Sequence, residues 1–121
     1  MEDVVIVIPS YKPHKEIMSE FLNKLKINFK EIVIVDDGSG LEYTEFFNKI
    51  EQSGIKVLRH NVNLGKGRAI KTAFNYCLNT YKNIKGTITA DCDGQHSVED
   101  IIKCAEKLIT KTLFFNKIIF T

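Results

Sequence analysis

The sequence of 121 residues predicts one α/β domain, in which helices cover both faces of a mostly parallel sheet. Short runs of β-branched residues, which are typical of strands buried on both faces, alternate along the chain with stretches of helical period. Hydrophobic residues make up 44% of the sequence and charged residues 26%. This composition supplies enough apolar surface for a core and excludes a disordered chain.

The first half of the chain alternates three predicted strands with two predicted helices. Pro9 is expected to end the first strand, and Ser53 with Gly54 to end the second helix. Ile17 and Phe21 begin a repeat of every fourth residue that gives the first helix an apolar face. The predicted strands are Val4–Ile8, Glu31–Val35 and Ile55–Leu58, and the predicted helices are His14–Phe29 and Tyr43–Gln52.

The second half begins with a polar loop at residues 60–63, before the clearest helical period in the chain, from about Arg68 to Tyr81. A fourth strand is predicted at Gly86–Ala90. Ser97 can cap a further helix, because its hydroxyl precedes acidic residues and a new apolar period.

The end of the chain departs from this alternation. We expect residues 1–110 to form the domain and residues 111–121 to form an atypical tail. Leu113–Phe120 is mostly β-branched or aromatic, which predicts a short strand at an otherwise exposed edge of the sheet. Because exposed strand edges favour pairing with other chains, a homo-oligomer is expected.

Cysteine usage and hydropathy indicate a cytoplasmic protein. Cys77, Cys92 and Cys104 are odd in number and form no Cys-x-x-Cys pair, which predicts reduced thiols and no cysteine-based zinc site. The acidic start and the short first apolar run exclude a signal peptide. No stretch approaches the roughly 20 apolar residues that a transmembrane helix needs.

The net charge of +2 hides an uneven distribution. Residues 52–90 carry seven basic and no acidic residues, whereas residues 1–51 carry six basic and ten acidic ones. A basic middle between acidic flanks suits a bound phosphate group beside a metal site, and no nucleic acid partner is expected. A solvated basic helix face would give the same pattern.

Polar residues follow three of the predicted strands. Because parallel strands of an open α/β sheet place their carboxyl ends at one edge, these residues are expected to line one ligand site. Tyr11 offers a flat face on which a nucleobase can stack, and Asp37 can accept a hydrogen bond from a base. Ordinary turns rich in Asp and Ser would explain the second cluster equally well. The three clusters are Pro9-Ser10-Tyr11, Asp36-Asp37 and Asp91-Cys92-Asp93.

The third cluster predicts a divalent metal. Asp91 and Asp93 offer the hard oxygen ligands that Mg²⁺ or Mn²⁺ prefers, and Gln95 can add a neutral oxygen. Cys92, between the carboxylates, is expected to point into the sheet as a small apolar residue. An Asp-Gly-rich turn without metal is the alternative interpretation.

A basic, glycine-rich entry precedes the longest helical period. Lys66 and Arg68 flank Gly67 at a helix N-terminus, an arrangement that favours an anion. The spacing matches neither a Walker loop nor a dinucleotide fingerprint. A flexible basic turn is the alternative.

These clusters together resemble the motifs of the family 2 glycosyltransferases, which have the GT-A fold, a Rossmann-like arrangement. The order and spacing are most similar to the branch that includes the dolichyl-phosphate mannose and glucose synthases, over about residues 4–109. The stretches that carry the resemblance are Val5-Ile6-Val7-Ile8-Pro9-Ser10-Tyr11, Val35-Asp36-Asp37-Gly38-Ser39, Asn63-Leu64-Gly65-Lys66-Gly67-Arg68-Ala69 and Asp91-Cys92-Asp93-Gly94-Gln95-His96.

The resemblance implies transfer of a sugar from a UDP- or GDP-sugar donor, with a polyprenyl phosphate as acceptor at the inner membrane face. It implies that Asp36 supports the second turn and that Asp91 lies near the ribose and the metal. Lys66 and Arg68 would lie near the donor phosphates or sugar. The nucleoside would contact Pro9, Ser10, Tyr11 and Asp37, and the metal would contact Asp91, Asp93 and Gln95.

Two positions and the length depart from the family pattern. Pro13 and Leu41 stand where the family often has Glu and Asp, and the chain ends soon after the metal motif. We therefore expect a domain that is incomplete at its C-terminus and weakly active alone. The alternatives are an inactive nucleotide-binding remnant, a partner-binding module without transferase activity, or a sugar nucleotidyltransferase.

Overall fold

The computed structural model describes residues 1–92, 97–111 and 117–120. Within them, five parallel strands form one sheet in the order β3-β2-β1-β4-β5. The strands are β1 (Val4–Ser10), β2 (Glu31–Asp37), β3 (Lys56–His60), β4 (Gly86–Thr89) and β5 (Lys117–Phe120).

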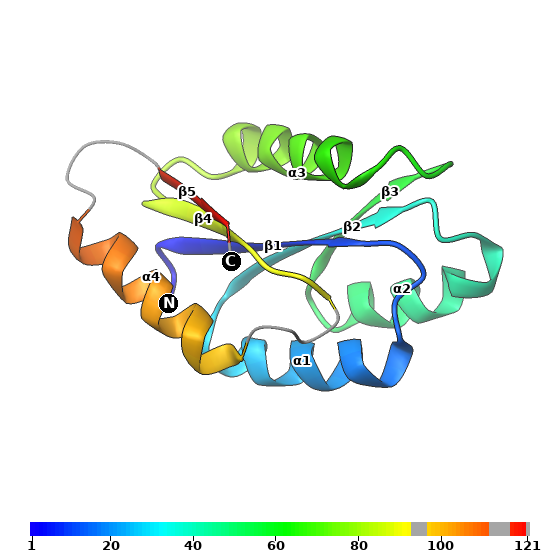
Figure 1. Cartoon of the computed structure of the whole chain (residues 1–121), viewed down its shortest axis with the longest axis horizontal. Helices are drawn as coiled ribbons and strands as arrows, with labels where there is room; N and C mark the ends of the chain where they lie inside the picture. Colours follow the sequence, from blue (N-terminus) through cyan, green and yellow to red (C-terminus); the bar gives the residue numbers. More distant parts are fainter. Residues whose placement is uncertain (93–96, 112–116, 121) are drawn as a thin grey trace.

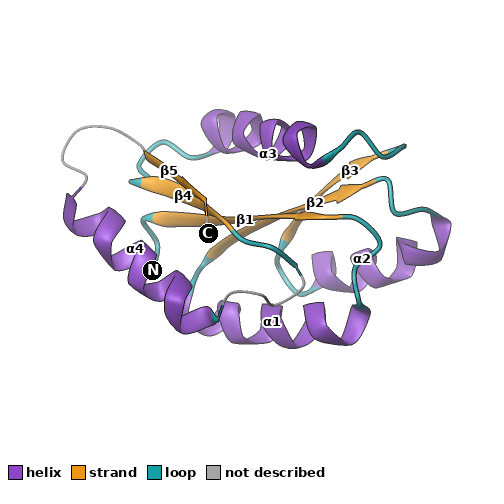
Figure 2. Ribbon diagram, in the orientation of Figure 1, coloured by secondary structure: helices purple, strands orange, loops and turns teal. Residues whose placement is uncertain are grey.

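Helices cover both faces of this sheet, so the molecule has three layers (Figures 1 and 2). Helix α3 lies alone above the sheet in these views, and α1, α2 and α4 lie below it. This arrangement confirms the predicted α/β class and agrees with a Rossmann-like fold. The helices are α1 (Lys15–Asn28), α2 (Thr44–Gln52), α3 (Lys66–Thr80) and α4 (Val98–Lys111), with a 3₁₀ turn η1 (Leu41–Tyr43) before α2. None of the described helices is long and apolar enough to cross a membrane.

The central strand β1 is buried along its whole length, as its continuous apolar run predicts. Its alternating side chains divide between two core clusters, one on each face of the sheet. On the α3 side, Val5 and Val7 pack with small residues of the helix, Ala69, Ala73 and Cys77. Because these small side chains recur every fourth residue, α3 can lie close to the sheet.

The prediction that Pro9 ends the first strand is wrong. The strand continues to Ser10, and Pro9 is paired with Val35 of β2. The backbone carbonyl oxygen of Val7 accepts a hydrogen bond from the amide of Ala90 at 2.9 Å. Odd-numbered residues of β1 therefore direct their backbone N–H and C=O groups toward β4. Pairing with β4 ends at Val7, and the missing N–H of Pro9 therefore breaks no bond of the sheet.

The end of the described chain joins the sheet. The prediction of a strand within 113–120 is confirmed for β5, which pairs in parallel with β4 at the edge of the sheet. Residues 113–116 of that prediction lie outside the described residues. Ser97 caps α4 as predicted, since its hydroxyl accepts from the amide of Asp100 at 3.1 Å.

Candidate functional site

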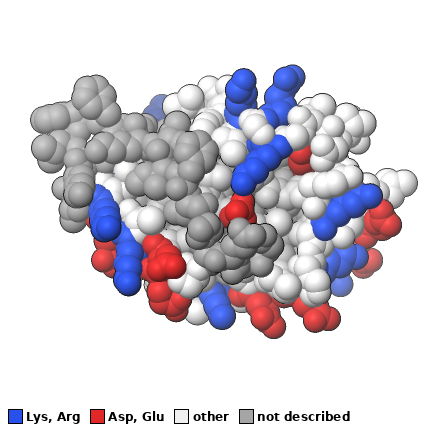
Figure 3. Space-filling model, in the orientation of Figure 1, with Lys and Arg blue, Asp and Glu red and all other residues white. Residues whose placement is uncertain are grey.

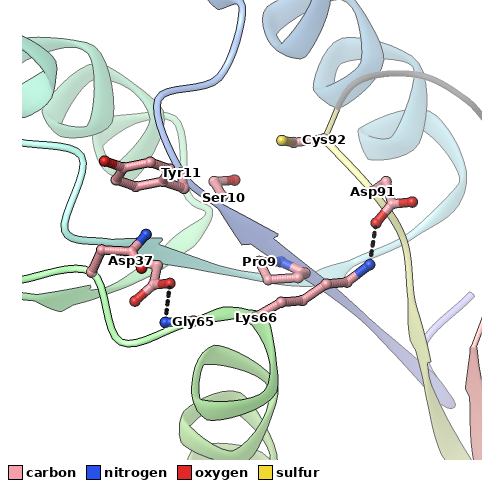
Figure 4. Close-up of a pocket in the computed structure, with 9 residues that line it drawn as sticks. Pro9, Ser10, Tyr11, Asp37, Gly65, Lys66, Asp91 and Cys92 are labelled. Atoms are coloured by element: carbon pink, nitrogen blue, oxygen red, sulfur yellow. Dashed lines mark hydrogen bonds and ion pairs between the residues drawn. The ribbon is translucent and has the colours of Figure 1, made fainter.

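A pocket of about 480 Å³ opens where the carboxyl ends of β1, β2 and β4 meet the entry to α3 (Figure 4). Its volume is in the range of small-molecule sites in proteins, about 300–1,000 Å³. The sheet brings together residues from all four sequence motifs, as the parallel topology predicts. The lining residues are Pro9, Ser10, Tyr11, Asp37, Asn63, Gly65, Lys66, Asp91 and Cys92.

Asp37, the last residue of β2, is buried and accepts three hydrogen bonds from the chain that leads into α3. One carboxylate oxygen lies 2.8 Å from Nδ1 of His60 and 2.9 Å from the amide nitrogen of Leu64. The other oxygen accepts from the amide of Gly65 at 3.0 Å. The carboxylate therefore fixes the loop between β3 and α3 at the edge of the pocket.

Two opposed effects set the pKa of Asp37. Burial raises the pKa, because it removes water from the charged carboxylate. The hydrogen bonds from His60, Leu64 and Gly65 favour the charged form and together outweigh burial, so the pKa lies below the ordinary 3.8. Asp37 is thus an anion at neutral pH, as its three donors require.

Gly38 allows the same loop to approach β2 closely. Its φ is +73°, and a Cβ atom built there would lie 2.2 Å from the backbone carbon of Val62. Only glycine fits both the positive φ and this contact. The motifs that contain Asp37 and Leu64 are therefore packed backbone to backbone.

A second set of hydrogen bonds joins the ends of β1 and β2. Asp36 accepts from the amide of Ser39 at 3.0 Å, and the Ser39 hydroxyl accepts from the amide of Lys12 at 2.9 Å. Asp36 and Ser39 are buried, and Asp36 does not line the pocket. Asp36 therefore stabilises the turn that follows β2.

The side chains at the end of β1 differ in exposure. Ser10 is buried, with its hydroxyl 3.8 Å from the sulfur of Met18. Tyr11 is 49% exposed and lies beside the pocket, as Figure 4 shows. Nζ of Lys12 lies 5.5 Å from the centroid of the Tyr11 ring. An exposed aromatic ring at the rim of a pocket can stack on a flat ligand.

One ion pair spans the opposite side of the pocket. Nζ of Lys66, at the start of α3, lies 2.8 Å from a carboxylate oxygen of Asp91, which follows β4 (Figure 4). The Lys66 side chain is 61% exposed and that of Asp91 26% exposed. A pair this open to water contributes about 0–1 kcal/mol to stability. It places one cation and one anion where they can exchange partners with a ligand.

Two predicted site residues among those that the structure describes, Asp36 and Arg68, do not line the pocket. Arg68 is exposed and is absent from the pocket lining, since it lies two residues into α3. Like Lys71, it belongs to the solvated side of that helix, where Figure 3 shows basic side chains above the sheet. The solvated-face interpretation therefore fits part of the basic middle. Asp93 and Gln95 lie outside the described residues.

Some residues that shape this site were not predicted from the sequence. Asn63 and Gly65 line the pocket, and His60 ends β3 beside Asp37, where a loop was predicted. Cys92 both packs against the core below the sheet and lines the pocket. The available signal for His60 was its position two residues after the predicted strand Ile55–Leu58.

Comparison with known proteins identifies the family. The sequence pattern described as glycosyl transferase family 2 matches residues 5–114, nearly the whole chain. The chain belongs to glycosyl transferase family 2. The residues that line the pocket all fall inside this match.

Three proteins similar to the chain come from Methanocaldococcus jannaschii and Methanococcus voltae. Two uncharacterized proteins of Methanocaldococcus jannaschii are 36% and 35% identical to the chain, over 93% and 87% of its length. The UDP-N-acetylglucosamine–dolichyl-phosphate N-acetylglucosaminyltransferase of Methanococcus voltae is 27% identical over 88% of the chain. The matched segments cover 43%, 46% and 47% of these relatives, so the chain spans less than half of each.

Proposed function

We propose that this family 2 chain binds a nucleotide-sugar donor in the pocket and contributes to transfer of the sugar to an acceptor. One observation carries the proposal: a single pocket joins an exposed aromatic ring, a buried carboxylate and a Lys–Asp ion pair from four distant motifs. Tyr11 and Asp37 lie on one side of this pocket, and Lys66 and Asp91 on the other.

The nucleoside is assigned to the side formed by β1 and β2. Tyr11 would stack on the base, and the second oxygen of Asp37, which accepts from the Gly65 amide, retains capacity to accept from the base. Pro9 and Ser10 would complete this wall. The donor would be a UDP- or GDP-sugar, by the family resemblance.

The diphosphate and a Mg²⁺ or Mn²⁺ ion are assigned to the side formed by β4 and α3. The described residues fit such an ion, because Asp91 presents a partly exposed carboxylate, the hard oxygen ligand that Mg²⁺ prefers. The Lys66 ammonium group, which contacts one of these oxygens, would then move to the substrate phosphates. Magnesium needs only one or two carboxylates in addition to water and substrate phosphates. No cluster of three or more acidic, His or Cys residues occurs among the described residues. Asp93 and Gln95 remain predicted ligands.

The proposed reaction breaks the bond between the anomeric carbon and the diphosphate and forms a bond from that carbon to an acceptor oxygen. Lys66 would stabilise the negative charge that develops on the leaving diphosphate. A bound divalent ion would supply further charge neutralisation at the same oxygens. Asp37 and the buried turn would hold the donor in the reacting orientation.

We propose a polyprenyl phosphate as the acceptor and the inner face of the membrane as the location. The name of the Methanococcus voltae relative supports this acceptor class. Exposed apolar side chains also follow β1, β2 and β3 in the chain, after the carboxyl ends of these strands, and would be available to contact lipid. They are Tyr11, Leu41, Val62 and Leu64.

A binding panel tests the donor assignment. Thermal unfolding is measured with UDP, GDP and their sugars, with and without Mn²⁺. A ligand at 100 times its dissociation constant stabilises the fold by about 2.7 kcal/mol, so a clear rise in Tm is expected with one base and Mn²⁺. No shift with any nucleotide would overturn the proposal. Donor binding without transfer to polyprenyl phosphate would favour a nucleotide-binding module instead.

A further inference from the structure

We infer that His60 is a positioning residue that locks Asp37 and the entry of α3 into the shape required by the pocket. The inference rests on the proposed function where it concerns the donor. His60 itself is not among the residues that line the pocket. It can therefore influence a ligand only through the groups that it holds.

The His60 ring bridges two elements that flank the pocket. Its Nδ1 lies 2.8 Å from Asp37 at the end of β2, and its Nε2 lies 2.8 Å from the hydroxyl of Thr72 on α3. The side chain is only 10% exposed, so water competes weakly for these contacts. Both ring nitrogens are thus used within the protein.

The bond to the carboxylate fixes the proton positions in this network. An ionised carboxylate only accepts, so Nδ1 of His60 donates to Asp37. In the neutral ring, Nε2 then accepts from the hydroxyl of Thr72. We assign this tautomer because it satisfies every donor and acceptor in the bridge.

The consequence of the bridge is that α3 is held at two points. The amides of Leu64 and Gly65 donate to Asp37 immediately before the helix, and Thr72 is held in the body of the helix. Two points of attachment fix both the position and the rotation of α3. Lys66, in the first turn, is thereby directed across the pocket toward Asp91.

The test measures amide hydrogen exchange and nucleotide affinity in the same set of variants. In His60→Ala, exchange of the Leu64 and Gly65 amides should accelerate at least tenfold. The Lys12 amide, which Ser39 holds, should keep its protection. The dissociation constant for the Mn²⁺ complex of UDP or GDP should rise at least tenfold, measured where circular dichroism shows the variant fully folded.

Conservative variants separate positioning from general destabilisation. In His60→Asn the amide can still donate to Asp37, so most of the affinity and protection should return. Thr72→Val breaks only the outer bond and should weaken binding by about threefold. Thr80→Val, at the exposed end of the same helix, is the matched control and should change neither measurement.

Three outcomes decide the inference. Unchanged exchange at Leu64 and Gly65 in both His60→Ala and Thr72→Val would overturn it. Faster exchange with unchanged nucleotide affinity would also overturn it, because the loop geometry would then not matter to the ligand. If the wild-type protein binds no nucleotide, the proposed function fails, and the exchange measurements alone decide whether His60 positions the loop.

Discussion

The two sides of the pocket are built differently. On the β2 side, the Asp37 carboxylate is buried and accepts from His60 and two backbone amides. On the β4 side, the Asp91 carboxylate is partly exposed and contacts the exposed ammonium group of Lys66. The first side is formed in advance by the fold, whereas the second keeps its charges available for exchange. Burial thus distinguishes a strand-end carboxylate that holds neighbouring backbone from one whose partner stays open to exchange.

The largest expected difference between the two sides is the loss of stability when the carboxylate of each side is removed. Asp37→Ala leaves buried donors without an acceptor, and we expect a loss of about 4 kcal/mol in the free energy of unfolding. Asp91→Ala should cost less than about 1 kcal/mol, because its pair is exposed. Urea denaturation of both variants measures this contrast. Equal losses would show that the two sides do not differ as described.

Substitution of Gly38 tests the close contact, on the β2 side, between the turn after β2 and the loop that leads into α3. Gly38→Ala must move the backbone of Val62, and we expect a loss of about 3 kcal/mol from the clash and the positive φ together. Gly54→Ala is the matched control, since its φ is +103° but no atom lies within 4 Å of the added Cβ. That variant should lose about 1 kcal/mol. A loss at Gly38 no greater than that at Gly54 would contradict the close approach.

The lowered pKa of Asp37 predicts where acid weakens the protein. Each unit by which folding lowers a carboxyl pKa adds about 1.4 kcal/mol of stability in the ionised state. This contribution is fully present above the ordinary value of 3.8 and is lost as pH falls through the lower folded pKa. The difference in unfolding free energy between wild type and Asp37→Asn should therefore narrow below pH 3.8. A constant difference from neutral pH down to acid would contradict this assignment.

The exposed ion pair gives the smallest expected effect on stability. Lys66→Gln should change the free energy of unfolding by less than about 0.5 kcal/mol. Nucleotide affinity should nevertheless fall about tenfold, the equivalent of about 1.4 kcal/mol, because a phosphate-binding cation is lost. Lys71→Gln, exposed on the same helix, is the control and should leave affinity unchanged. The same fall in both variants would indicate a general charge effect.

The sequence predicted the fold and the edge of the sheet that holds the pocket, because hydrophobic period and strand-end polarity are local signals. The structure places four of the predicted residues at one pocket on this edge: Tyr11, Asp37, Lys66 and Asp91. The part played by Asp37 in holding the α3 entry could not be predicted, since its partners come from a distant loop. Arg68 was predicted to join the site because it flanks Gly67 at the helix entry and by the family resemblance, but a helix turns successive side chains to different sides, and Arg68 does not line the pocket.

The place of β4 in the sheet also has a consequence for the order of folding. Val5 of β1 pairs with Glu31 of β2 on one side and with Thr87 of β4 on the other. Of these two neighbours, β2 is far closer to β1 along the chain. Loop closure costs more entropy for the distant partner, and we expect β1, β2 and β3 to associate before β4 docks. Pulse-labelled exchange during refolding should protect amides of β2 before those of β4. During synthesis, the Asp37 side would then form while the strand that leads to Asp91 is still being made.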